Sequence, residues 1–340
     1  MRLSLLPAAG TCLLVLLATA GCGIVGGDDG DTVRVYSGRH YDLEQAFEAF
    51  AAETGISVEF QFGGDVELRE RIAAEGERTP ADVYLTVDAG NLWQAAEQGL
   101  LAPLDSAALR EAVPAGLRDP DGHWYGLSMR ARTVMYHPDR VDPSEFATTD
   151  TYADLADPRW HGRLCMRNST NSYTQSLVAS LIAAHGAERA AEIVRGWVDN
   201  DVEIFNNDIQ ILENVAAGGC DVAITNHYYL ARLLAEDPDL PVRVFWANQD
   251  GRGVHVNISG GAVLAHADDP ELARRLIEWL ATTGQSSFVD GNHEYPVNPA
   301  VAPEPVIAEF GEFEYEPINA RAYGELNARA VQLMNRAGYP

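Results

Sequence analysis

Tyrosine side chains follow three of the strands that the sequence predicts. Tyr41 follows the first strand, Tyr173 follows a strand in the middle of the chain, and the pair Tyr228 and Tyr229 follows a later one. Ligands of α/β proteins bind at the carboxyl ends of strands, so these loops are candidates for one shared site. Because adjacent residues of a helix point about 100° apart, we expect the pair to straddle a strand-to-helix turn.

Phenol oxygens favour a particular class of metal ion. A phenolate is a hard anionic ligand that suits a small trivalent cation, whereas imidazole and thiolate favour softer divalent metals. A free phenol has a pKa near ~10, so at neutral pH it binds only a metal that displaces its proton. Ferric iron does so, whereas magnesium and calcium prefer carboxylate and carbonyl oxygens. We therefore predict an Fe³⁺ site whose affinity falls in acid.

The same residues allow other interpretations. A tyrosine near a strand end is commonly a half-buried packing residue, and aromatic-lined sugar pockets use the same side chain. The alternative function is therefore a binding protein for an organic or oxyanion solute, such as a phosphonate, a polyamine or a sugar. An enzyme is not expected, because the sequence shows no His/carboxylate cluster, no Gly-x-Ser-x-Gly elbow and no phosphate-cradling loop.

Strand and helix patterns alternate along most of the chain. A short β-rich run at 32–36 precedes Leu43, Phe47 and Phe50, whose spacing of three and four is typical of a helix. Further strands are expected at 58–62, 82–87, 162–167 and 221–225, and further helices at 65–75, 172–185, 188–199, 208–217, 229–235, 270–281, 284–289 and 319–335. Such alternation implies parallel crossovers and an α/β sheet.

Four extended runs mark where the chain passes between two halves. The runs 122–128 and 132–137 have no helix between them, and the apolar runs 242–246 and 258–266 can return the chain to the first half. Two α/β halves with two crossings predict a two-lobed α/β fold with a central ligand cleft. The predicted boundaries are 32–131 plus 257–340 for the N-lobe and 132–256 for the C-lobe.

The amino terminus has the features of an export signal. Arg2 gives a positive start, an apolar core at 13–18 follows, and residues 1–21 are too short to be a spanning helix. Ala20-Gly21-Cys22 matches a lipoprotein signal, although Thr19 departs from the usual aliphatic residue. We expect lipidation of Cys22, with 22–31 as a flexible tether and release as a soluble protein as the alternative. The predicted location is the periplasm or the outer face of the cytoplasmic membrane.

The charge of the chain limits the kinds of partner it can bind, and its cysteines indicate how they are bonded. The formal net charge is −26, and all 24 basic residues are arginine, so a nucleic-acid partner, which needs a basic face, is not expected. An acidic surface also serves solubility, and the charge alone does not argue for a metal. Cys165 and Cys220 remain in the exported part, and two thiols there favour a disulfide over a metal site. We expect a monomer.

Seven segments, in order and with compatible spacing, resemble the ferric-iron-binding protein family of bacterial ABC importers. They are Val35-Tyr36-Ser37-Gly38-Arg39-His40-Tyr41, Thr79-Pro80-Ala81-Asp82-Val83, Arg130-Ala131-Arg132, 168–176, 217–229, Asn257-Ile258-Ser259-Gly260 and Glu294-Tyr295-Pro296. The resemblance covers nearly the whole mature chain. It implies a type II periplasmic-binding-protein fold that closes over Fe³⁺ and presents it to a permease in the inner membrane.

The resemblance also implies roles for individual residues. The implied ligands are Tyr41, Tyr173, Tyr228 and Tyr229, with His40 as a further ligand or a partner of one. Another branch of the family uses a carboxylate after the third strand and an exogenous anion. Here that position is Val87 with Asp88 as its neighbour, which favours the tyrosine-rich arrangement.

Two arginines near the first crossing are candidates for supporting roles. Arg130 and Arg132 could offset the charge of several phenolates or hold a carbonate-like anion beside the metal. Equally, either could cap a strand or pair with an acid. His227, next to the paired tyrosines, is expected to be a turn residue and not a ligand.

Overall fold

The structure, a computed structural model, describes residues 31–39 and 43–340. The predictions on the leader, Cys22, His40 and Tyr41 lie outside these residues. Within the described part, no helix combines the length and the apolar character that crossing a membrane requires.

Ten strands form one continuous sheet. They are β1 (Thr32–Ser37), β2 (Ser57–Phe62), β3 (Val83–Thr86), β4 (Tyr125–Tyr136), β5 (Leu164–Arg167), β6 (Glu203–Phe205), β7 (Val222–Asn226), β8 (Arg243–Phe245), β9 (His255–Val263) and β10 (Tyr295–Pro296). The order is β2-β1-β3-β9-β4-β7-β5-β6, with β8 and β10 also paired to β4. The parallel pairs expected from the alternation occur at both ends, β1 with β2 and β3, and β5 with β6 and β7.

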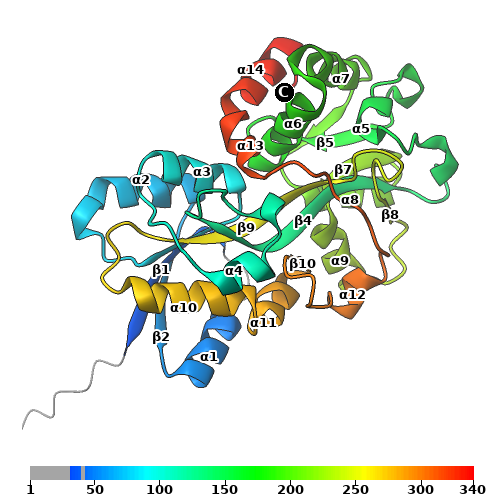
Figure 1. Cartoon of the computed structure of the whole chain (residues 1–340). Helices are drawn as coiled ribbons and strands as arrows, with labels where there is room; N and C mark the ends of the chain where they lie inside the picture. The colour runs from blue at the N-terminus through cyan, green and yellow to red at the C-terminus, as the bar shows by residue number, and fades with distance from the viewer. Residues whose placement is uncertain (1–30, 40–42) are drawn as a thin grey trace, which may run out of the picture.

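Helices cover both faces of the sheet, which confirms the α/β class. They are α1 (Leu43–Thr54), α2 (Asp65–Glu75), α3 (Ala89–Glu97), α4 (Ala107–Ala112), α5 (Thr151–Asp154), α6 (Ser172–His185), α7 (Ala187–Asp199), α8 (Asp208–Ala216), α9 (His227–Glu236), α10 (Pro270–Ala281), α11 (Gln285–Val289), α12 (Pro305–Ala308), α13 (Arg321–Glu325) and α14 (Asn327–Ala337). At the β1–β3 end, α1, α10 and α11 lie on one side of the sheet and α2 and α3 on the other (Figure 1).

Two long strands carry the chain between the lobes. The two extended runs predicted at 122–128 and 132–137 are wrong as separate elements, because β4 is one twelve-residue strand. It pairs with β9 from Tyr125 to Arg132, with one register shift between Gly126 and Ser128. All nine residues of β9 are buried, as expected for a strand in the middle of a sheet with helices on both faces. These central antiparallel strands join the two lobes in Figure 1.

The end of the chain packs differently from the single helix predicted at 319–335. The helix is interrupted at Leu326, giving α13 and α14. α13 contacts both α3 and α6, and α14 packs on α6 and α7, as Figure 1 shows. A close approach brings α13 to α3, because a side chain at Gly324 would lie 2.6 Å from the ring of Trp93. The lobe boundaries drawn from the sequence stay a prediction.

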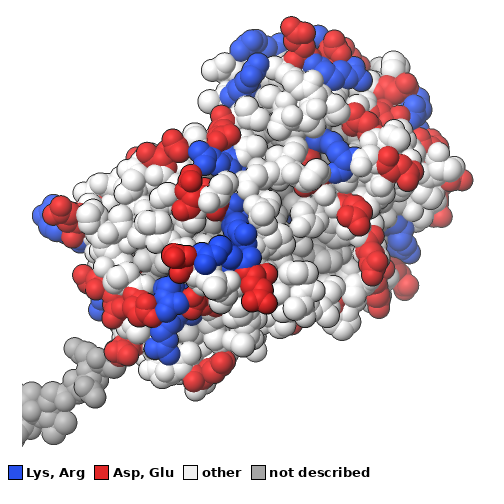
Figure 2. Space-filling view, in the orientation of Figure 1, with Lys and Arg blue, Asp and Glu red and all other residues white. Residues whose placement is uncertain are grey.

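The visible surface carries charges of both signs. In the view of Figure 2, acidic and basic side chains are interspersed over both lobes. Many of these arginines pair with neighbouring acids, such as Arg321 with Glu325 and Asp121. No large basic face is visible on this side of the molecule.

Candidate metal site

Three of the predicted tyrosines lie together at one end of the sheet. The Tyr228 hydroxyl donates a hydrogen bond to the Tyr173 hydroxyl at 3.4 Å, and the rings of Tyr228 and Tyr229 lie 4.1 Å apart between centroids. Tyr173 belongs to the first turn of α6, which follows β5, and the pair to the first turn of α9, which follows β7. Because β5 and β7 are parallel neighbours, their carboxyl ends meet at the same edge.

The prediction that Tyr228 and Tyr229 straddle a strand-to-helix turn is wrong. α9 begins at His227, after Asn226, so both tyrosines are already helical. Their rings nevertheless meet, because two long side chains can converge although their Cα–Cβ bonds diverge by about 100°. The sequence placed the start of this helix at Tyr229, two residues after the observed start at His227, and errors of this size are usual at the ends of elements.

The phenols of Tyr228 and Tyr229 are protonated at neutral pH in the iron-free protein. Burial, reinforced by the neighbouring Tyr173 and Tyr229, raises the pKa of Tyr228 well above its ordinary value. Burial also raises the pKa of Tyr229, and Tyr173 and Asp208 add to the effect. A ligand that needs phenolates must therefore displace protons, which only a strong Lewis acid can do.

Arg130 faces the tyrosines from the crossing strand β4. Its guanidinium carbon lies 5.2 Å from the centre of the Tyr173 ring, and its Nη2 donates to the carbonyls of Val87 and Ile258. Burial disfavours its charge, but Tyr173, Glu294 and Tyr228 outweigh burial and raise the pKa of Arg130. Arg130 is thus held as a fixed positive charge beside the phenols.

The two Nη atoms of Arg132 bind groups other than the tyrosines. Its Nη1 donates to Asp208 at 2.9 Å and to Asn226 at 3.1 Å, and its Nη2 donates to the Ile224 carbonyl at 3.1 Å. Of the two roles left open for this residue, the structure therefore shows pairing with an acid. The Arg132–Asp208 pair is almost fully buried and braces β4 against α8 and β7.

Arg167 is a further residue at the site, and sequence reasoning missed it. It ends β5, donates from Nη1 to Asp208 at 2.6 Å, and lies with its guanidinium carbon 5.5 Å from the centre of the Tyr173 ring. It also interacts with Tyr229. The sequence did contain a signal for this residue, because Arg167 stands at the carboxyl end of the strand that precedes Tyr173.

A narrow polar gap lies directly behind Tyr173. It is lined by Arg130, Arg132, Tyr173, Ser176, Asn226, His255 and Asn257. The Nε atoms of both arginines are buried without a hydrogen-bond partner. The gap is closed in this structure and leaves no room for a water-sized molecule.

Among residues 31–39 and 43–340, no acidic side chain takes the place of a phenol at this site. Asp88 caps α3, accepting from the Asn91 amide at 3.0 Å and from Asn257 Nδ2 at 2.8 Å. Val87 offers only its carbonyl, which accepts from Arg130. Among the described residues, the one group of three His, Cys, Asp or Glu close enough to hold a metal is formed by Cys165, Glu203 and Cys220.

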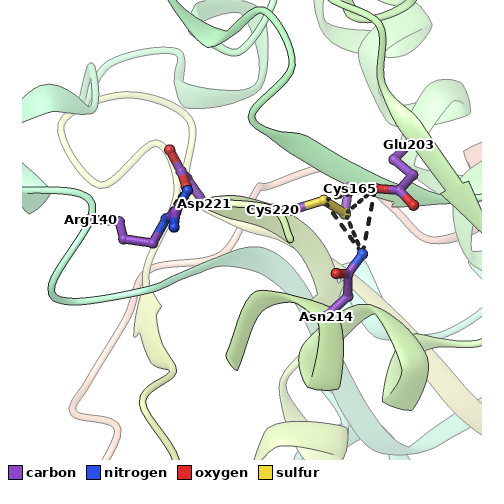
Figure 3. The surroundings of a disulfide bond; sticks show 6 residues. All are labelled: Arg140, Cys165, Glu203, Asn214, Cys220 and Asp221. Carbon is purple, nitrogen blue, oxygen red and sulfur yellow. Dashed lines mark hydrogen bonds and ion pairs between the residues drawn. A yellow bond between two sulfur atoms is a disulfide. The ribbon is translucent and has the colours of Figure 1, made fainter. Parts of the chain in front are cut away.

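Those cysteines do not belong to the tyrosine cluster. Cys165 on β5 and Cys220, just before β7, form a disulfide bond, with Glu203 and Asn214 beside the sulfur atoms (Figure 3). The bond joins two neighbouring strands near their amino ends, whereas the tyrosines lie at the carboxyl ends.

His227 is not a turn residue. It is fully buried in α9, where its Nδ1 accepts from the Ala131 amide at 3.2 Å and its Nε2 donates to the His293 carbonyl at 3.0 Å. These partners require a neutral ring protonated on Nε2, and burial lowers the pKa of His227 to about 4. His227 therefore ties α9 to β4 and to the His293 segment, with both of its ring nitrogens engaged in hydrogen bonds.

Comparison with known proteins agrees with this geometry. The family described as bacterial extracellular solute-binding protein matches residues 78–309. Iron uptake protein A1 of Synechocystis is 42% identical over 316 residues, which cover 90% of this chain and 87% of that protein. The chain belongs to the ferric-iron-binding periplasmic protein family. The resemblance seen in the sequence is thereby confirmed.

Solved structures in the family share the whole fold. The Trichodesmium protein IdiA (FutA), solved in complex with iron and citrate ligands, is 43% identical, with a TM-score of 0.87 over 91% of this chain and 100% of that one. Ferric iron-binding protein A of Mannheimia haemolytica, in an open conformation, is 31% identical, with a TM-score of 0.84 over 91% of this chain and 98% of that one. The predicted two-lobed type II fold is thus confirmed.

Proposed function

We propose that this protein is the extracytoplasmic binding component of an iron ABC importer, which captures Fe³⁺ with phenolates and delivers it to the permease. The observation that carries the proposal is the convergence of Tyr173, Tyr228 and Tyr229 from two helices beside Arg130. Three phenols with fixed cations nearby suit a hard trivalent ion that can displace protons. Relatives named for iron uptake and ferric-iron binding support the same assignment.

The chain's own residues prepare the site for charge that appears on binding. Each phenol that binds Fe³⁺ releases a proton; three phenolates balance the charge of the ion, and a fourth from Tyr41 would leave one negative charge over. Arg130 and Arg167 already lie over the Tyr173 ring, where they stabilise the phenolate form. Acid reverses the reaction, because protons compete with the ion for the same oxygens.

The opposite lobe is proposed to supply Tyr41, with His40 as a further ligand or a partner of one. The segment that bears them starts from Arg39, which is buried and pairs with Glu294 from the far end of the chain. Arg39 Nη1 lies 3.3 Å from the Ser128 hydroxyl oxygen, two residues before Arg130 on β4, so the start of the segment lies at the strand that faces the described phenols. A ligand from this segment would let the ion hold the two lobes together.

A small anion such as carbonate is proposed as a companion of the metal. The buried cation of Arg130 beside Tyr173 supports this proposal, and the anion would enter only after the side chains around the closed gap move apart. Before iron binds, the anion would neutralise the charge of the arginines. After iron binds, it would occupy the coordination positions of the metal that the phenolates leave open.

Iron loading tests the proposal directly. Addition of Fe³⁺ as a weak chelate should produce a visible phenolate-to-iron charge-transfer band that disappears on acidification. The double variant Tyr228→Phe/Tyr229→Phe should lose iron affinity by orders of magnitude. Tyr136→Phe is the matched control, because this tyrosine lies further along β4, packed on Phe146. A colourless loaded protein, or equal iron affinity in the double variant, would contradict the proposal.

Membrane attachment through a lipid on Cys22 is part of the proposal. Relatives named as periplasmic binding proteins support an extracytoplasmic location, and the cysteine follows a signal-like segment. Mass spectrometry of the protein extracted from membranes should show a diacylglyceryl-modified N-terminal cysteine, which Cys22→Ala abolishes. Light scattering of the purified soluble part should give the mass of one chain.

A further inference from the structure

A surface groove of about 600 Å³ lies between α7 and α14. Its lining includes Ala187, Ala191, Arg195, Glu325, Arg329 and Arg336. The two alanines are one turn apart on α7, and their short side chains leave the space beside α14 open. None of the described tyrosines lines the groove, so it is separate from the candidate metal site.

The three arginines of the groove are not paired with acids. The guanidinium groups of Arg195 and Arg329 have no hydrogen-bond or ion-pair partner in the described part of the chain, and Arg336 donates only to the neutral Gln332, at 3.2 Å. Of the described residues that line the groove, Glu325 is the one acid, and it already accepts from Arg321 at 2.7 Å. The groove therefore carries a net positive charge with no internal counter-charge left over.

A positive groove stands out on this acidic chain. The formal net charge is −26, and many arginines elsewhere on the surface pair with acids, such as Arg110 with Asp105 and Arg274 with Glu271. In Figure 2, basic side chains are visible at the top of the upper lobe, where Figure 1 places α7 and α14. A local excess of arginine attracts an anionic partner, whereas a nucleic acid or a second copy of the chain is repelled by the net charge.

The spacing of the arginines selects a peptide as the anion. Arg329 and Arg336 are seven residues apart on one face of α14, which is about 10 Å along the helix axis. Arg195 lines the groove from α7, on its other side. An extended peptide rises by about 3.3 Å per residue, so carboxylates three residues apart repeat at the same distance of about 10 Å. A single small ion offers no such repeat.

We propose that the groove between α7 and α14 docks an extended acidic segment of a partner protein. Carboxylates of the segment pair with Arg195, Arg329 and Arg336, and its backbone lies over the alanines of α7. The three arginines are exposed, so the docking is weak, salt-dependent and fast to form. The interaction does not depend on iron or on the tyrosines.

A dye-labelled peptide with glutamate at every third position in a serine background is the probe, and its anisotropy reports binding to the iron-free protein. Binding should be saturable at low salt and should disappear when glutamine replaces glutamate in the peptide. Arg329→Gln/Arg336→Gln should weaken binding by about tenfold or more. Arg78→Gln/Arg275→Gln is the matched control, because it removes the same charge from two exposed arginines that form no ion pair with a described residue and lie outside the groove.

A second variant distinguishes docking in the groove from general attraction to arginine. Ala328→Trp fills the groove from an exposed position and keeps all three charges, so it should also weaken peptide binding by about tenfold. The proposal is overturned by equal binding of the two peptides, by unchanged binding in Ala328→Trp, or by an equal loss in the control variant. It is also overturned if phosphatidylglycerol vesicles, and not the peptide, bind in a way that the arginine variant abolishes. Every measurement uses iron-free protein, so the outcome is independent of the iron assignment.

Discussion

Asp208 is the residue whose replacement should separate the stability of this protein from its affinity for iron. It is fully buried at the start of α8, and its two carboxylate oxygens accept from Arg132 at 2.9 Å and from Arg167 at 2.6 Å. Asp208→Asn keeps the shape but removes the negative charge and turns one acceptor into a donor. At least one of the two guanidinium groups then faces an amide N–H.

The size of the stability loss follows from burial of the pair. Breaking a buried ion pair by removing one partner costs about 3–5 kcal/mol, because the remaining charge is left uncompensated. For domains of a few hundred residues, each kcal/mol lowers the unfolding midpoint by about 2–4 °C. The midpoint of the iron-free variant should therefore fall by roughly 6–20 °C.

The effect on iron should have the opposite sign. Asp208 is one of the groups that raise the pKa of Tyr229, whereas Arg167 lowers it. Without the carboxylate, Arg167 acts unopposed, the pKa of Tyr229 falls, and Fe³⁺ displaces its proton more easily. The variant should hold iron to a lower pH than the unmodified protein does.

Two measurements check the reasoning. Thermal unfolding of iron-free protein reports stability, and the pH midpoint of the charge-transfer band reports iron release. Asp221→Asn is the matched control, because Asp221 also pairs with two arginines, Arg140 and Arg163, but lies at the opposite end of β7 (Figure 3 shows Arg140 and Asp221). An unchanged unfolding midpoint in Asp208→Asn, or iron release at higher pH, would refute the argument.

Three further outcomes are expected. Iron affinity should fall about tenfold per pH unit for each phenol proton displaced. At constant free Fe³⁺ the four proposed tyrosine ligands should therefore give a slope near four below neutral pH, and a slope near three would mean that Tyr41 does not bind; the measurement is competition with a chelator of known pH dependence. Burial opposes ionisation of Glu294, but Arg39 and Arg130 outweigh burial and lower the pKa of Glu294 below its ordinary value of 4.5. The ionised Glu294 therefore stabilises the fold at pH values above 4.5, and this stabilisation is lost as the pH falls through the lowered pKa of the folded protein. Glu294→Gln should flatten the acid limb of the stability–pH curve, and an identical limb would contradict this. Reduction of the Cys165–Cys220 disulfide, which closes a loop with a sequence separation of 55, should cost about 4 kcal/mol in chemical denaturation, with no change in iron affinity.

Local periodicity was enough to predict most elements. The helix at 270–281 and the helix at 172–185 have the predicted bounds, since each is a run of apolar residues at helical spacing with a capping residue before it. The strand-helix alternation also indicated the class of fold and the edge of the sheet where the tyrosines gather. These features depend on residues close together in the chain.

Features that depend on distant partners could not be read in this way. The roles of Arg167 and Arg132 became visible only once folding brought Asp208 between them, 41 and 76 residues along the chain. The continuous β4 and the break before α14 likewise depend on pairing with β9 and on packing against α3 and α6.

The sequence alone therefore determined the kind of most elements and the residue types present at one edge of the sheet, because spacing and side-chain chemistry are local properties. The tertiary structure decided which charges face the phenols and which only brace the strands behind them. It decided this because the partner of a buried charge is chosen by proximity in space, and many different partners are compatible with the same local pattern.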